Sequence, residues 1–87
     1  MAWVYILKIK SGRFYVGSTS DLSRRLAQHV SGHTPTTKRL PIEGLVLKQE
    51  YKTLKDARAI EAKIKKLKRK DYIEKMVEDG YIKLTPA

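Results

Sequence analysis

The sequence contains no cysteine, little acidic charge and no long apolar run. Without cysteine the chain has no disulfides and no thiolate metal ligands, which is compatible with a reducing cytoplasm, where we expect the protein to act. The apolar stretch over residues 3–7 is far shorter than the roughly 18 residues that a membrane span needs. No basic segment followed by a long apolar core opens the chain, so we expect neither a secretory signal nor a membrane partner.

Basic residues are abundant where acidic ones are scarce. The chain has 19 Lys and Arg against 9 Asp and Glu, a formal net charge of +10. A small domain with this charge attracts a polyanion over a Debye length of about 8 to 10 Å. Nucleic acid is the expected partner, and a solubilising surface, ribosome association or an acidic membrane face are the alternatives.

The length and composition indicate one small globular domain. The chain has 87 residues, of which 41% are hydrophobic and 32% charged, a balance typical of folded proteins. A chain this short buries only about 60% of the surface that it exposes when unfolded. We therefore expect a single domain over residues 1–87, of modest stability and monomeric.

The first half of the chain predicts a β-hairpin. Residues 3–9 are too continuously apolar for a half-exposed strand, which favours the centre of a sheet, and residues 13–18 follow as its partner. A two-residue turn would put Tyr5 and Tyr15 on opposite faces. A three-residue turn over 10–12 puts Leu7 opposite Tyr15 and both tyrosines on one face, so we predict this turn, with Gly12 at positive φ.

A helix is expected next, from Asp21 to about residue 31 or 32, with Ser20 as its cap. Its apolar face is unusual because Arg25 and His29 take positions where aliphatic residues are normal. Arg24 lies about 100° away on the helix and is expected to be solvated.

The second half predicts a strand and two helices. Residues 33–41 form a loop, 42–51 a third strand, and a long helix begins at Thr53 or Lys55 and ends near Arg69. Asp71 and Glu74 resemble a capping box for a last helix that ends at Gly80, and Ile82 and Leu84 can anchor the tail. The predicted fold class is α+β, a three-stranded antiparallel sheet flanked by helices in the order β-β-α-β-α-α.

Five side chains carry a resemblance to a known family. In order and spacing they match the catalytic positions of the GIY-YIG endonuclease superfamily: Tyr5, Tyr15 within Tyr15-Val16-Gly17, Arg25, His29 and Glu61. The glycine and isoleucine that name the first segment are absent here. The chain resembles small, single-domain members of the UPF0213 or URI type, which are related to the nuclease domain of the UvrC excision-repair protein.

The resemblance implies hydrolysis of nucleic-acid phosphodiesters, DNA first, with a possible place in repair or recombination. One tyrosine accepts a proton from the attacking water and the other positions water or metal ligands; which does which stays open. Arg25 holds a non-bridging phosphate oxygen. Glu61 binds one Mg²⁺ or Mn²⁺, an ion that needs few protein carboxylates. Gly12 and Gly17 are structural.

The basic residues extend this reading to substrate binding. Six of the eight residues from Lys63 to Lys70 are basic. We expect phosphate contacts without base selectivity from Arg24, Lys38, Arg39, Lys65, Lys66, Lys68 and Arg69. Taken alone, Glu61 and Lys65 are an ordinary i,i+4 surface pair. The alternative function is therefore a basic nucleic-acid-binding module that keeps the fold without cleaving.

Overall fold

A computed structural model describes residues 1–10, 12–30, 42–67 and 69–84, with the side chains of His29, Val30 and Ile42 left aside. The elements are β1 (Ala2–Ile9), β2 (Phe14–Thr19), α1 (Leu22–Val30), β3 (Ile42–Tyr51), α3 (Leu54–Leu67) and α4 (Lys70–Asp79). The strands form one antiparallel sheet in the order β2-β1-β3. The predicted α+β class and element order are confirmed, and each observed strand lies within one residue of its predicted bounds.

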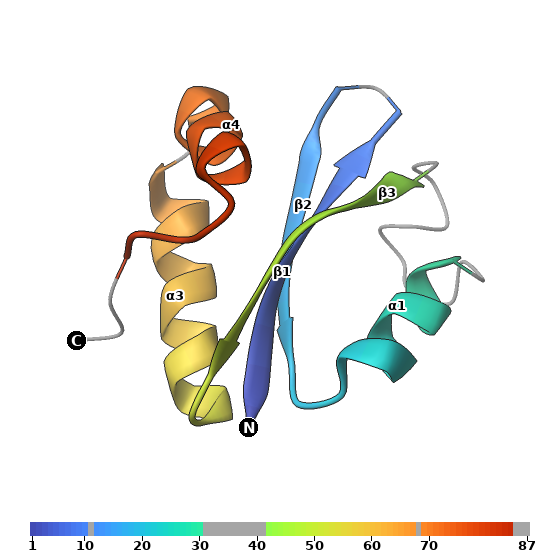
Figure 1. Cartoon of the computed structure of the whole chain (residues 1–87), viewed down its shortest axis with the longest axis vertical. Helices are drawn as coiled ribbons and strands as arrows, with labels where there is room; N and C mark the ends of the chain where they lie inside the picture. Colours follow the sequence, from blue (N-terminus) through green and yellow to red (C-terminus); the bar gives the residue numbers. More distant parts are fainter. Residues whose placement is uncertain (11, 31–41, 68, 85–87) are drawn as a thin grey trace.

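The central strand β1 is buried on both faces, as its continuous apolar sequence predicts. Ala2, Val4 and Ile6 belong to the main core cluster with Ile60 and Ile64 of α3. The alternate residues, including Tyr5 and Leu7, are equally buried and point to the opposite face, because successive side chains of a strand alternate. Figure 1 shows α3 and α4 on one side of the sheet and α1 on the other.

The hairpin has the predicted three-residue turn. Leu7 pairs with Tyr15, and the Ile9 amide donates to the Arg13 carbonyl at 2.9 Å, so residues 10–12 form the loop. Gly12 has φ +89°, a conformation that residues with a Cβ rarely adopt. This register places Tyr5 and Tyr15 on the same face of the sheet. Strand β2 is an edge strand of the sheet.

Two predicted helix caps are wrong. Ser20 does not cap α1; the Asp21 carboxylate does, accepting the Arg24 amide at 3.1 Å, and a carboxylate also suits the positive end of the helix dipole. The proposed capping box at Asp71 and Glu74 fails because α4 starts one residue before Asp71. Arg69 takes the N-cap position without a side-chain cap bond, and Asp71 lies in the first turn, where it pairs with Arg69.

The other helix ends follow the sequence. Thr53 caps α3, since its hydroxyl accepts the Asp56 amide at 3.1 Å. Gly80 ends α4 in the left-handed conformation, with its amide donating to the Met76 and Val77 carbonyls. The tail is fixed by the Gln49 side-chain amide of β3, which bonds both the amide and the carbonyl of the buried Ile82.

Candidate active site

Tyr5 and Gly17 are direct partners across β1 and β2. A Cβ built on Gly17 would lie 2.3 Å from the Tyr5 hydroxyl oxygen and 2.5 Å from Cζ, closer than real atoms approach. The phenol ring therefore crosses over Gly17, where only glycine leaves room. The Tyr5 hydroxyl therefore lies at the edge strand β2, although Tyr5 is a fully buried residue of the central strand.

Tyr15 lies beside Tyr5 on the same face of the sheet. The two ring centroids are 6.4 Å apart and the rings are tilted by 32°. Tyr5 is fully buried, whereas Tyr15 is half-buried. Of the two phenols, Tyr15 is thus the one better placed to meet a ligand at the edge of the sheet.

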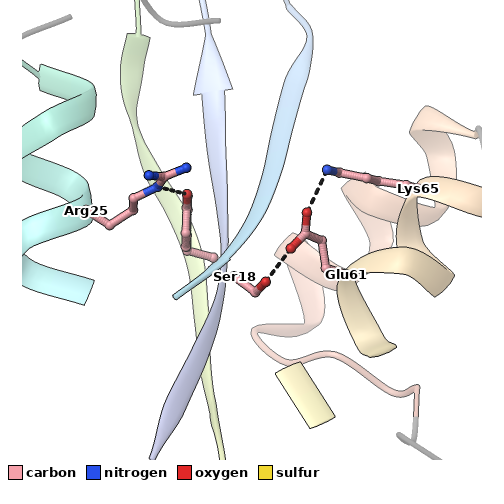
Figure 2. A network of polar contacts seen from close by, with 5 residues as sticks. Ser18, Arg25, Glu61 and Lys65 are labelled. Carbon is pink, nitrogen blue, oxygen red and sulfur yellow. Dashed lines mark hydrogen bonds and ion pairs between the residues drawn. The ribbon is translucent and has the colours of Figure 1, made fainter. Parts of the chain in front are cut away.

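Arg25 reaches this pair from α1. Its Nε donates to the Tyr5 hydroxyl at 3.3 Å, the bond drawn at Arg25 in Figure 2. Its Nη1 also donates to the Gln28 side chain at 3.4 Å, so two contacts hold the guanidinium. Burial raises the pKa of the Tyr5 phenol above its ordinary value of 10.0, partly offset by the Arg25 hydrogen bond. The same bond raises the pKa of Arg25. At neutral pH the pair is therefore a neutral phenol and a charged guanidinium.

Glu61 approaches β2 from the opposite side. Its Oε1 accepts a hydrogen bond from the Ser18 hydroxyl, and its Oε2 accepts one from Lys65 Nζ at 2.6 Å (Figure 2). Ser18 follows Gly17 directly, so its side chain projects from the other face of the strand. The negative charge of Glu61 is the smallest of the causes that raise the Tyr5 pKa, of which burial is the largest.

The structure therefore divides the five predicted catalytic residues. Tyr5, Tyr15 and Arg25 gather on the α1 face of the sheet, while Glu61 stands on the α3 face. The expectation that all the side chains converge in one pocket is not met, because residues 17 and 18 present opposite faces of the edge strand to the phenol and to the carboxylate. The side chain of His29 lies outside the described residues, as do Lys38, Arg39 and Lys68 entirely.

A groove of about 370 Å³ lies at the start of β2. It runs between β2 and the helices α3 and α4, and Tyr15 and Lys65 both border it. Its floor is apolar, and every charged residue that lines it is basic. The lining residues are Arg13, Phe14, Tyr15, Val16, Ile64, Lys65, Arg69, Lys70 and Ile73. This charge pattern suits an anion with an apolar group attached.

The predicted phosphate contacts have different surroundings. Arg24 and Lys66 are exposed. Lys65 is paired with Glu61. Arg69 forms a bidentate pair with the Asp71 carboxylate, at 3.0 and 3.2 Å, and lies 5.0 Å from the centre of the Tyr72 ring. The hydrogen bond to Asp71 raises the pKa of Arg69, and the same bond lowers the pKa of Asp71.

Sequence reasoning missed Ser18, Arg13 and Lys70. Ser18 directly follows the Tyr15-Val16-Gly17 segment, so its nearness to the motif was the available signal. Lys70 closes the basic run and Arg13 precedes the second strand, but only the packing of α4 beside β2 brings them to one groove. Their shared position could not be read from spacing.

The donor set at Glu61 fits a hard divalent cation. A carboxylate and a hydroxyl offer oxygen ligands, and Mg²⁺ commonly takes one or two carboxylates and completes its octahedron with water and substrate phosphate. Within residues 1–10, 12–30, 42–67 and 69–84, no three His, Cys, Asp or Glu side chains gather as a ready-made cage. A cation bound through Glu61 would depend on water and substrate for its other ligands.

A family model described as the GIY-YIG catalytic domain matches residues 1–76. The chain belongs to the GIY-YIG family. The predicted resemblance to the GIY-YIG family is thereby confirmed. GIY-YIG domains are typical of nucleases, which act on nucleic acid and generally use divalent metal ions.

The similar proteins are UPF0213 proteins. One from Streptococcus pneumoniae is 39% identical over 70 residues, which cover 78% of this chain and 70% of that protein. SERP0126 from Staphylococcus epidermidis is 34% identical over 80 residues, covering 90% and 95%. The solution NMR structure of BH0048 from Bacillus halodurans superposes with a TM-score of 0.58 at 32% identity, covering 92% of this chain and 87% of that one. This GIY-YIG relative has the same fold.

No helix in the described part of this GIY-YIG chain is long and apolar enough to cross a bilayer.

Proposed function

We propose that this protein is a metal-dependent endonuclease that hydrolyses phosphodiester bonds of nucleic acid, with DNA as the main substrate. The reaction would take place at the edge strand β2. The observation that carries the proposal is the arrangement around Gly17 and Ser18. A buried phenol paired with a guanidinium lies on one face of these two residues, and a carboxylate lies on the other. A role in DNA repair or recombination is consistent with this reaction.

Arg25 is assigned to the scissile phosphate. Its guanidinium is anchored by Tyr5 through Nε and by Gln28 through Nη1, and its positive charge would stabilise a non-bridging phosphate oxygen, which gains charge in the transition state. Tyr5 is assigned to positioning Arg25, because its hydroxyl accepts the Arg25 hydrogen bond and its ring is fully buried.

Tyr15 is assigned to the attacking water. It is half-buried, lies beside Tyr5 and borders the groove, so its hydroxyl can orient a water or receive its proton. Glu61 would hold the divalent cation, which supplies charge stabilisation at the phosphate and lowers the pKa of bound water. The groove takes the strand next to the scissile bond, since its cations match phosphates and its apolar floor matches a sugar or base.

Cleavage of labelled branched, single-stranded and duplex DNA in Mg²⁺ or Mn²⁺ tests the proposal. Removing the Tyr15 hydroxyl or the Glu61 carboxylate takes away a proton acceptor or the cation site, so Tyr15→Phe and Glu61→Ala should each lower the rate by about 10² or more. Tyr72→Phe and Glu78→Ala are matched controls on exposed residues of α4 and should keep full activity.

Activity equal in all five proteins would contradict the assignment and point to a contaminating nuclease. Tight binding of DNA without any cleavage would favour the alternative, a basic binding module. The ion pair of Glu61 with Lys65 is the observation that favours this alternative, since a carboxylate satisfied by a lysine needs no metal.

A further inference from the structure

Both oxygens of the Glu61 carboxylate are already engaged. Ser18 donates to Oε1, and the Lys65 ammonium lies 2.6 Å from Oε2, one helical turn away on α3. The Glu61 side chain is 21% exposed, whereas that of Lys65 is 56% exposed. The carboxylate is thus held in place. The ammonium that neutralises it belongs to a long side chain that is largely exposed to solvent.

Lys65 also lies next to a surface that could bind a second anion. It borders the groove, whose other charged lining residues are Arg13, Arg69 and Lys70. A phosphate in this groove would offer the ammonium a partner of the same sign as Glu61. The Lys65 side chain lies between the Glu61 carboxylate and the groove, so its ammonium can pair with either anion.

We propose that in the free protein Lys65 holds the cation position at Glu61, and that a nucleic-acid phosphate in the groove draws Lys65 away and opens Glu61 to a divalent ion. The inference rests on the proposed metal-dependent function. It makes Lys65 a positioning residue that couples two binding events. Nucleic acid and metal ion then bind cooperatively, because each removes the obstacle to the other.

The expected size of the effect follows from the charges. An exposed i,i+4 ion pair is worth a factor of about two. Repulsion between an ammonium and a divalent ion a few ångströms apart adds a further factor of several, even in a water-like medium. Removing the ammonium should therefore raise the metal affinity of the free protein by about three- to tenfold.

Titration of the protein with Mn²⁺, followed by the electron paramagnetic resonance signal of the free ion, measures this affinity without any turnover. Lys65→Met keeps the aliphatic stem, removes the charge and should bind Mn²⁺ about three- to tenfold more tightly than wild type. Lys55→Met is the matched control: it makes the same change in net charge at an exposed position in the first turn of α3 and should shift the affinity by less than about twofold, because exposed distant charges are screened.

Glu61→Ala distinguishes failure of the proposed metal site from failure of the role given to Lys65. If Glu61→Ala binds Mn²⁺ as well as wild type does, the metal site is elsewhere, and the proposed function and this inference fail together. If binding requires Glu61 but Lys65→Met and Lys55→Met behave alike, only the role of Lys65 is overturned.

The coupling itself is read from a second titration. In a Tyr15→Phe background, which suppresses cleavage, a short DNA oligonucleotide should strengthen Mn²⁺ binding more in the Lys65 protein than in the Lys65→Met protein, by the same three- to tenfold factor. Equal strengthening in both would overturn the exchange of Lys65 between carboxylate and phosphate.

Discussion

At the scale of single residues, the contact between Tyr5 and Gly17 decides where the functional groups lie. The Tyr5 ring is fully buried in the central strand, and its hydroxyl reaches the Arg25 guanidinium only because residue 17 has no Cβ. Burial supplies stability, and the hydroxyl at the end of the ring supplies the anchor for Arg25. One missing side chain therefore links the core to the site.

Gly17→Ala should disrupt both the packing of the Tyr5 ring and the anchoring of Arg25. The new Cβ would lie 2.3 Å from the Tyr5 oxygen with ring atoms behind it, so the ring must move. We expect a loss of about 2 to 3 kcal/mol in the free energy of unfolding, at the upper end for overpacking, measured by urea denaturation.

Gly44→Ala is the matched control, because a Cβ there meets nothing within 4 Å and the free energy should change by less than about 0.5 kcal/mol. Equal stability of the Gly17 and Gly44 variants would show that the Tyr5 ring does not need this space.

At the scale of elements, α3 carries two functions on two faces. Ile60 and Ile64 hold it to the sheet, while Glu61 and Lys65 lie one turn apart at the rim next to β2. The groove then depends on α4, which begins at Lys70, the last residue of the basic run, and brings this lysine to the same groove as Arg13. The groove is thus formed by the helix pair rather than by either helix, and so is the surface proposed to bind substrate.

The salt dependence of DNA binding tests this groove. Each phosphate contact contributes about 0.7 to 0.9 to the slope of log affinity against log salt, so Arg13→Ala/Lys70→Ala should flatten the slope by about 1.4 to 1.8. Fluorescence anisotropy without divalent ions measures it.

Lys52→Ala/Lys55→Ala, which removes the same charge from exposed residues at the other end of α3, should leave the slope within about 0.3 of wild type. A slope that depends only on the number of charges removed would discard the groove as the phosphate path.

At the scale of the whole molecule, alkaline pH should weaken the fold through its buried tyrosines. Burial raises the pKa of both Tyr5 and Tyr51 above 10.0, so the native state keeps these protons at a pH where the unfolded chain has lost them. The stabilisation is complete below pH 10 and is lost as pH rises through the higher native pKa values, because the unfolded state then binds fewer protons.

Urea denaturation at pH 8 and at pH 11 measures this loss. Tyr5→Phe/Tyr51→Phe should lose less stability between the two pH values than wild type does, whatever its stability at pH 8. Deprotonation of lysines is common to both proteins and cancels in the difference. Parallel losses would show that these phenols do not titrate with unfolding.

Local patterns predicted most of the fold because the physics that sets them is local. The apolar run of β1 indicated a central strand, and the parity of Tyr5 and Tyr15 required the turn at Gly12. The caps at Ser20 and Asp71 were predicted wrongly, because neighbouring residues compete for one amide and the start of a helix is settled by packing.

The sequence by itself determined the family and the central place of β1, since both follow from residue types at short spacing, and it named the side chains that the proposed reaction uses. Only the tertiary structure decided that Tyr5 and Arg25 stand on one face of β2 while Glu61 stands on the other, with Lys65 on its carboxylate. The reason is physical: which face a distant helix covers, and which ion a carboxylate meets there, depend on contacts between residues more than 40 positions apart.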